Sequence, residues 1–197
     1  METKDTKRVF IAIHLDQEII KYLHSVQEEI ISCIERNREI KIKFVEMNNL
    51  HISLKFLDEL KPLEIEKTMA ILQKNTVKYQ PFEIHLLKSI GIFPNDRKPR
   101  VLWIGINEGS QMIQTIYDAI EKDIVKEIFH RKDNHFAAHI TLGRVRCFKN
   151  PDKIIECRNQ VSYKNISQVV NSIELMESKL TSQGPIYRVI KRFPLAH

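Results

Sequence analysis

The sequence has few of the residues that make a chain flexible or cross-linked. Only 5 glycines and 7 prolines occur among 197 residues, which leaves little room for long linkers. The three cysteines, Cys33, Cys147 and Cys157, are odd in number and show no Cys-x-x-Cys spacing. We therefore expect free thiols in a reducing compartment, and neither a disulfide framework nor a zinc site.

Long apolar segments are also missing. No run of 18 or more apolar residues occurs, so the sequence predicts no transmembrane helix. The first eight residues, METKDTKR, are polar and lack the apolar core of a secretory signal. We therefore expect a cytoplasmic protein without a membrane partner.

The composition is that of a globular domain, with 43% hydrophobic and 28% charged residues. The length suits one domain with a sizeable core. A formal net charge of +6 favours an anionic partner, of which nucleic acid is the commonest. The alternative for this charge is a lysine-rich surface that serves only solubility.

Apolar spacing predicts an α+β protein. We expect strands at 8–14, 41–44, 50–57, 82–87, 101–106, 138–145, 168–177 and 185–192, and helices at 16–34, 62–75, 110–128 and 152–160. Residues 91–99 are rich in turn formers and positive charge and predict a loop.

Two tetrapeptides within this pattern nearly repeat each other. They are His51-Ile52-Ser53-Leu54 and His139-Ile140-Thr141-Leu142, which begin 88 residues apart, close to half the chain. Side chains alternate along a strand, so each tetrapeptide puts its histidine and its hydroxyl residue on one face. The repeat predicts an internal duplication within a single domain, residues 1–197, with the two histidines facing one cleft.

Two histidines beside one phosphate ester could act as general base and general acid. The neutral imidazole takes a proton from the attacking water, and the protonated one gives a proton to the leaving oxygen. Ser53 and Thr141 would donate hydrogen bonds to the non-bridging phosphate oxygens. Two histidines alone are too few for a metal site, so we expect neither a metal nor another cofactor.

These residues lie in longer blocks that resemble a known family. The blocks are RVFIAI from Arg8, NLHISLKFLDE from Asn49, GIFP from Gly91, PRVLWIG from Pro99 and HITLGRV from His139. The tetrapeptides resemble the paired H-x-T-x signature of the 2H phosphoesterases. More narrowly, residues 8 to 146 resemble the LigT-like RNA 2′,3′-cyclic phosphodiesterases, first described as 2′-5′ RNA ligases.

The resemblance implies a bilobed α+β fold, with two pseudo-symmetric lobes that each hold an antiparallel sheet with helices outside, and an active cleft between them. It implies hydrolysis of RNA 2′,3′-cyclic phosphate ends, tRNA fragments among them, to 2′-phosphomonoesters by a monomer that needs no metal or nucleotide. His51 would be the proton donor and His139 the proton acceptor. Ser53 stands where the family usually has threonine, and Asp58 where it often has glycine.

Three further residues are candidates for substrate binding. Lys55 shares the face of His51 and Ser53 if alternation continues. Arg144 has the opposite parity to His139 and would reach the cleft only through a bulge near Gly143 or the end of the strand. Phe10, like Phe56, could stack on a base or pack in the core.

The loop cations leave two interpretations open: Arg97, Lys98 and Arg100 could follow an RNA backbone or be ordinary surface charge. Two other functions also remain. One is a 2′-5′ RNA ligase or 2′-5′ phosphodiesterase, and the other is an RNA-binding module without catalysis.

Overall fold

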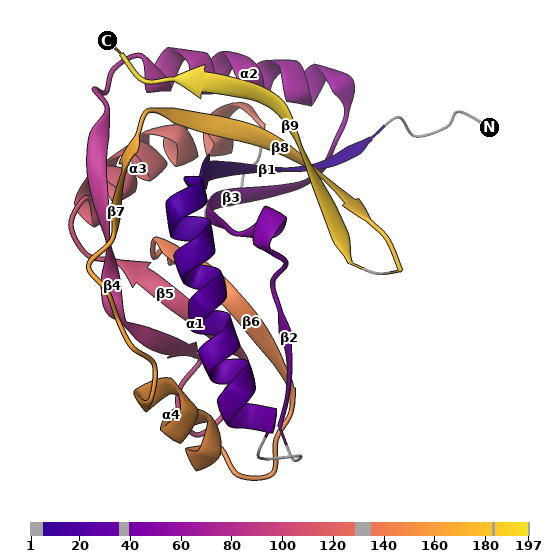
Figure 1. Ribbon diagram of the computed structural model, residues 1–197. Coiled ribbons are helices and arrows are strands. Elements are labelled where there is room, and N and C mark those ends of the chain that lie inside the picture. The colour runs from indigo at the N-terminus through magenta and orange to yellow at the C-terminus, as the bar shows by residue number, and fades with distance from the viewer. Residues whose placement is uncertain (1–5, 36–39, 129–134, 183, 197) are drawn as a thin grey trace.

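The computed structural model describes residues 6–35, 40–128, 135–182 and 184–196 (Figure 1). Most of the polar start therefore lies outside the described residues. The described helices are α1 (Gln17–Glu35), α2 (Pro62–Thr76), α3 (Ser110–Glu127), α4 (Asp152–Asn159) and the 3-10 turn η1 (Met47–Asn49). The strands are β1 (Lys7–His14), β2 (Lys41–Phe44), β3 (His51–Leu60), β4 (Phe82–Phe93), β5 (Val101–Ile106), β6 (His139–Cys147), β7 (Ser167–Val170), β8 (Ser172–Leu180) and β9 (Pro185–Pro194).

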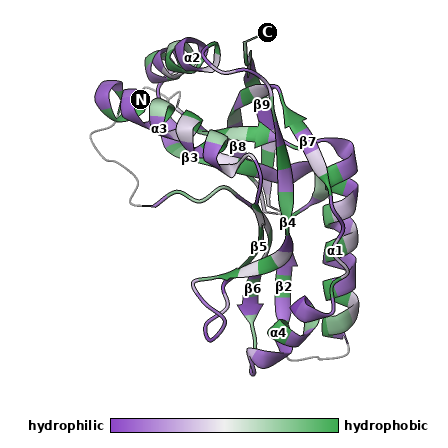
Figure 2. Cartoon of the chain, turned by 90° about the vertical axis from the view of Figure 1, so that its left-hand side faces the viewer, coloured by the Kyte–Doolittle hydropathy of each residue, from purple (hydrophilic) through white to green (hydrophobic). Residues whose placement is uncertain are grey.

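The strands form one curled antiparallel sheet, whose curvature is visible in Figure 2. Its order is β7-β4-β5-β6-β3-β1-β8-β9, and β2 pairs with the later part of β6, from Gly143 to Cys147. The sheet thus has two halves that meet where β3 lies beside β6. The predicted α+β bilobed fold is confirmed, with the sheets of the two lobes joined into one.

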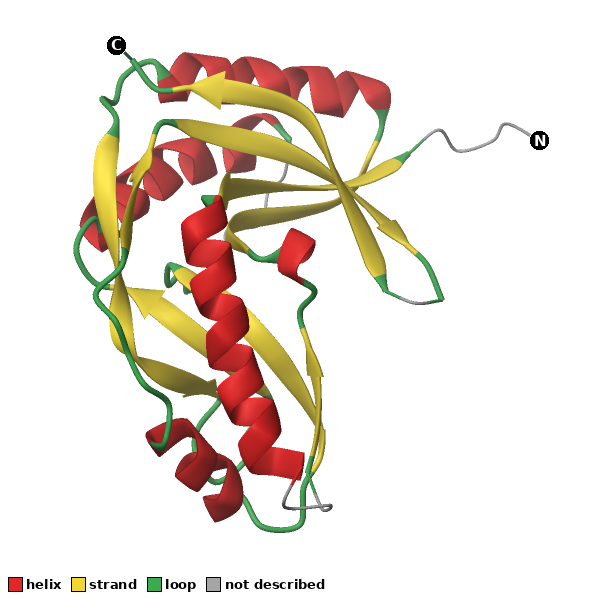
Figure 3. Ribbon diagram, in the orientation of Figure 1, coloured by secondary structure: helices red, strands yellow, loops and turns green. Residues whose placement is uncertain are grey.

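Each half has two helices on its outer surface (Figure 3). Helices α2 and α3 contact each other and the β3, β8 and β9 half. Helix α1 contacts α4 and covers the other half, where the buried Gln27 side chain donates to the carbonyls of Val45 and Leu142, both at 2.9 Å. Within the described part of the chain, no helix is long and apolar enough to cross a membrane.

The strands β3 and β6 have the same order of exposed and buried residues over nine positions. From His51 and from His139 alike, the order is half-buried, buried, half-buried, two buried, exposed, buried and two exposed. Residues 88 positions apart therefore have the same burial in the two strands, as an internal duplication predicts. The duplication itself stays a prediction.

Two predicted boundaries change in the structure. Strand β4 runs on to Phe93, so the predicted loop begins three residues later, at the cis Phe93–Pro94 peptide. The single strand expected at 168–177 is two strands, because β7 pairs with β4 while β8 pairs with β1. The chain crosses between the two halves at Asn171, and alternation within a strand does not reveal such a crossing.

The prediction of three free cysteines is wrong. Cys33 of α1 and Cys157 of α4 form a disulfide across 124 residues of sequence. Only Cys147 is a free, exposed thiol. The pairing escaped the sequence analysis because it depends on α1 and α4 lying against the same half of the sheet.

Candidate active site

The two tetrapeptides lie side by side at the centre of the sheet. Strands β3 and β6 pair at Ile52 and Ile140, the equivalent residues of the two repeats, and both are fully buried. Antiparallel pairing at this point puts His51 across from Thr141 and Ser53 across from His139. All four side chains point away from the buried isoleucines, on what we call the histidine face.

Both imidazoles are oriented by the same hydrogen bond. His51 Nδ1 lies 2.7 Å from the carbonyl oxygen of Asn49, and His139 Nδ1 lies 2.7 Å from that of Ala137. A carbonyl oxygen only accepts, so each Nδ1 carries a proton and donates it. Each Nε2 is therefore the ring nitrogen that can exchange a proton with a substrate.

His51 has a second contact, because its Nε2 lies 2.7 Å from Ser53 Oγ. Burial lowers the pKa of His51, and the nearby imidazoles of His139 and His14 lower it further, although the bond to Asn49 opposes the shift. The neutral form is thus favoured before an anion binds, with the Ser53 hydroxyl donating to Nε2. An anion bound here would raise the pKa and favour the protonated form.

Aromatic side chains support each histidine ring. The ring centroids of Phe10 and Tyr187 lie 5.0 and 5.3 Å from that of His51, and the Tyr187 and His51 ring planes meet edge-on at 88°. On the other half, Phe93 and Trp103 lie 5.3 and 5.9 Å from the His139 ring. Such contacts restrict rotation of the imidazoles and hold their orientation.

Phe10 is therefore a support for His51 and not a platform for a base. Its side chain is 1% exposed and packs against Phe56 and Tyr187 as well as His51. Phe56 is 57% exposed and is the accessible ring of this group. The expectation that Phe10 could stack on a substrate base is corrected by its burial.

A bulge in each motif strand decides which later side chains reach the histidine face. In β3, Ser53 and Lys55 oppose the consecutive residues Ala12 and Ile11, so Leu54 is an extra residue. In β6, Leu142 is the extra residue at the equivalent position. An extra residue reverses the alternation of everything after it.

The bulge at Leu142 turns Arg144 to the histidine face, as the sequence analysis required for this residue. Arg144 is exposed, and its charge is close enough to Tyr187 to oppose the rise that burial causes in the pKa of the tyrosine. The equivalent bulge at Leu54 brings Phe56 to the same face.

Lys55 is turned to the opposite face by the same bulge. Its Nζ lies 2.7 Å from Glu121 Oε2 of α3, and the two side chains are 4% and 2% exposed. The parity argument that placed Lys55 beside His51 and Ser53 is therefore wrong, because it assumed an unbroken alternation. The structure gives Lys55 a buried structural partner.

Asp58, which stands where the related family often has glycine, has a φ of 53°. This left-handed conformation favours glycine, and aspartate is among the residues that tolerate it. Asp58 therefore holds a backbone conformation that a glycine would adopt without strain.

Several contributors to the site had no recognisable signal in the sequence. Asn49 holds His51 through its carbonyl, and its side-chain amide donates to the Pro185 carbonyl at 2.9 Å, which ties the β8–β9 hairpin to the site. Tyr187 follows in that hairpin. Trp103 of β5 pairs with Gly91 of β4, and a Cβ on Gly91 would overlap the indole, so the glycine makes room for the ring.

Within the described residues, no group of three or more His, Cys, Asp or Glu side chains could hold a metal ion. The groups that the histidine face offers for chemistry include the imidazoles of His51 and His139, the hydroxyls of Ser53 and Thr141, and the guanidinium of Arg144, with the exposed His14 paired to His51 beside them.

Comparison with known proteins places the chain in a family. Residues 9–195 match the family model described as AKAP7 2′5′ RNA ligase-like domain. The chain is 34% identical over 189 residues to the RNA 2′,3′-cyclic phosphodiesterase of Methanocaldococcus jannaschii, covering 94% of this chain and 99% of that protein. It is 33% identical over 186 residues to the protein of the same name from Archaeoglobus fulgidus, covering 94% and 99%.

Solved structures agree with this assignment at the level of the fold. A crystal structure of a Thermus thermophilus protein superposes with a TM-score of 0.78 at 24% identity, covering 95% of this chain and 97% of that one. Escherichia coli LigT complexed with 3′-AMP superposes with a TM-score of 0.71 at 20% identity, covering 98% and 100%. The chain belongs to the AKAP7 2′5′ RNA ligase-like domain family and is a LigT-like 2H phosphoesterase.

Proposed function

We propose that the protein hydrolyses RNA 2′,3′-cyclic phosphate ends to 2′-phosphomonoesters, without a metal or nucleotide cofactor. The observation that carries the proposal is the matched orientation of the two imidazoles. One comes from each half of the sheet, and each has its Nδ1 held by a main-chain carbonyl 2.7 Å away. The names of the relatives at 33% and 34% identity support the same reaction.

His139 acts as the proton acceptor and His51 as the proton donor. Water attacks the phosphorus while His139 Nε2 takes its proton, and the bond between phosphorus and O3′ breaks. His51 Nε2 gives its proton to O3′, which leaves as a hydroxyl. General acid–base catalysis of this kind contributes on the order of 10² to 10⁴ in rate per group.

The hydroxyls and the guanidinium act on the phosphate. Thr141 and Ser53 donate to its non-bridging oxygens, where charge accumulates, and Arg144 adds a positive charge. The bound anion also raises the pKa of His51, which burial lowers in the empty site. Protonated His51 then donates its Nε2 proton, which leaves the Ser53 hydroxyl hydrogen for the phosphate.

Two alternatives use the same face. A 5′-hydroxyl of RNA in place of water would make the site a 2′-5′ RNA ligase, and the reverse reaction is 2′-5′ phosphodiester cleavage. Binding of RNA without catalysis would need neither imidazole to change its protonation state. A monomeric state, tRNA fragments as substrates and a cytoplasmic location remain predictions. The Cys33–Cys157 disulfide counts against the cytoplasmic location, because disulfides are rare in cytosolic proteins.

The test uses a 2′,3′-cyclic mononucleotide in the presence of EDTA. We expect a 2′-phosphate product, with kcat/KM reduced at least 10²-fold in His51→Ala and in His139→Ala. Full activity in either variant, or a strict need for added metal, contradicts the mechanism. Tight RNA binding without hydrolysis of either a mononucleotide or an oligonucleotide favours the binding module.

A second substrate separates the roles of the two histidines. In a 3′-bridging phosphorothiolate the leaving group is a thiolate, which needs no protonation. We expect this substrate to restore much of the activity of His51→Ala and none of the activity of His139→Ala. The opposite pattern would exchange the two roles.

A further inference from the structure

A basic groove lies beyond Arg144, at the end of the same strand. It has a volume of about 340 Å³ and is lined by Lys98, Pro99, Arg100, Val145, Arg146, Cys147 and Phe148. We propose that this groove binds a backbone phosphate of the RNA strand whose 3′ end occupies the histidine face. The proposal rests on the proposed function, and it makes the substrate an oligonucleotide and not a free nucleotide.

The charges in the groove are available to a ligand. Within the described part of the chain, no carboxylate lines the groove or forms an ion pair with Lys98, Arg100 or Arg146. The nearest acidic side chain in the loop, Asp96, is bound by Arg158 on the far side. Three uncompensated cations in one hollow favour an anion with several acceptor oxygens, such as a phosphodiester.

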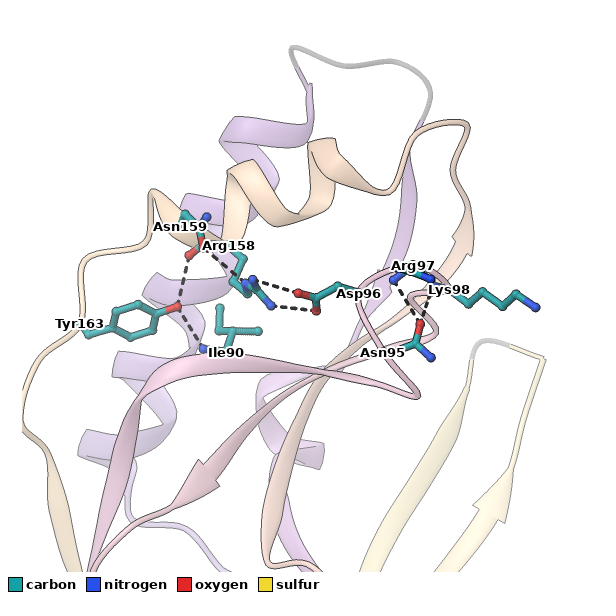
Figure 4. A network of polar contacts seen from close by, with 8 residues as sticks. All are labelled: Ile90, Asn95, Asp96, Arg97, Lys98, Arg158, Asn159 and Tyr163. Atoms are coloured by element: carbon teal, nitrogen blue, oxygen red, sulfur yellow. Dashed lines mark hydrogen bonds and ion pairs between the residues drawn. The ribbon is translucent and has the colours of Figure 1, made fainter.

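The loop that carries these cations is held in one conformation. Figure 4 shows Asp96 turned toward Arg158 of α4, with two bonds of 3.0 and 3.3 Å, while Lys98 extends away from that helix. The Asn95 side chain accepts from the main-chain N–H groups of Arg97 and Lys98, both at 3.1 Å. Little conformational entropy remains to be lost when the loop binds a ligand.

Main-chain bonds join the loop to the motif strand. The N–H of Arg100 donates to the Phe93 carbonyl at 2.8 Å, and the N–H of Val145 donates to the Arg100 carbonyl at 2.9 Å. Arg144, which the bulge turns to the histidine face, directly precedes the groove residues Val145, Arg146 and Cys147 in β6. Strand β6 therefore carries both His139 and one wall of the groove, and main-chain bonds hold the loop that forms the other wall.

The spacing suits an RNA chain. Arg146 comes seven positions after His139 in β6, so the two lie roughly 20 Å apart at about 3.3 Å per residue. A cyclic phosphate is the 3′ terminus, so the rest of the RNA leaves in the 5′ direction only. An RNA chain that runs along β6 would place in the groove a phosphate that lies a few nucleotides upstream of the 3′ end. Phe148 there offers a ring on which a base can stack.

The kinetic test compares a 2′,3′-cyclic mononucleotide with a hexanucleotide that ends in the same cyclic phosphate. For Arg100→Glu/Arg146→Glu we expect the ratio of the two kcat/KM values, hexanucleotide over mononucleotide, to fall about tenfold. The salt dependence of hexanucleotide binding should weaken by about 0.7 in logarithmic slope for the one phosphate that leaves the groove. Lys67→Glu/Lys122→Glu, on the exposed outer surfaces of α2 and α3, makes the same charge change and should leave the ratio as in the wild type.

A second measurement locates the RNA directly. Cys147 lines the groove and is the only free cysteine, so it can carry a photo-crosslinker without further substitution. We expect crosslinks to nucleotides a few positions upstream of a non-hydrolysable 3′ end. Crosslinking only to the terminal nucleotide, or to none while the RNA binds elsewhere, such as over the β8–β9 hairpin, overturns the proposal.

The two proposals fail in different ways. Equal wild-type kcat/KM for both substrates, with an unchanged ratio in the double variant, removes the groove and leaves the hydrolase intact. Hydrolysis of neither substrate removes the hydrolase, while crosslinking from Cys147 still decides whether RNA enters the groove.

Discussion

Replacing Lys55 by methionine should destabilise the protein severely without touching the reaction. The change leaves the Glu121 carboxylate, which is 2% exposed, without the ammonium group now 2.7 Å away. Removal of one partner of a buried ion pair costs about 3–5 kcal/mol. For a domain of this size each kcal/mol lowers Tm by roughly 2–4 °C, so the expected drop in Tm is on the order of 10 °C.

The double variant Lys55→Met/Glu121→Leu should recover most of that loss. It removes both charges and fills the space with apolar groups of similar volume, which is close to neutral for many buried pairs. Urea unfolding of the wild type, both single variants and the double variant measures the coupling between the two residues. Lys122→Met is the matched control, because Lys122 is the exposed neighbour of Glu121.

Activity of the folded double variant decides between the two placements of Lys55. We expect kcat/KM on a cyclic mononucleotide within about twofold of the wild type, measured well below the lowest Tm. A loss of tenfold or more in a stable double variant would refute the reasoning, because it would return Lys55 to the substrate. A double variant no more stable than Lys55→Met would show that the pair is not the cause of the loss.

The remaining predictions concern the histidine, its hydroxyl partner and the disulfide. Ser53→Ala should lower kcat/KM by about tenfold, which is the value of one hydrogen bond to a charged group. Ser53→Thr keeps the hydroxyl and should keep the activity. Equal kinetics for the wild type and both variants would contradict this. Burial lowers the pKa of His51 from 6.5, so the unfolded chain binds a proton that the folded one does not, and the free energy of unfolding should fall as pH drops below about 6.5. Denaturant titrations at pH 7.5 and 5.5 should show a weaker pH dependence in His51→Gln than in the wild type, and an identical dependence would count against it. Cys33→Ser/Cys157→Ser should lower the free energy of unfolding by about 4–5 kcal/mol in the loop-entropy account of a 124-residue separation, with Cys147→Ser unchanged; stability unaffected by reductant would disprove the cross-link.

Local patterns were sufficient for most of the fold. Apolar spacing located the four α-helices of the described residues, and period-two alternation put His51 with Ser53 and His139 with Thr141 on common faces. Both kinds of inference depend only on neighbours in sequence. They hold wherever backbone geometry stays regular.

The failures arise where geometry is irregular or contacts are distant. The bulge at Leu54 reversed the alternation and moved Lys55 to the opposite face, and no residue type in the strand announces it. The pairing of Cys33 with Cys157 and the approach of Tyr187 to His51 join segments that are more than a hundred residues apart. Such contacts depend on the order of strands in the sheet, which local patterns do not determine.

The pairing of Ile52 with Ile140 has a consequence for the architecture as a whole. In a twofold-symmetric dimer, the residue at the axis meets its own copy, and Ile52 and Ile140 hold the same place in the two similar tetrapeptides. The chain therefore contains, within one polypeptide, the contact that two identical subunits would make. In the mechanism we propose, the acid and the base come from different halves, so the site becomes complete only where the two halves meet.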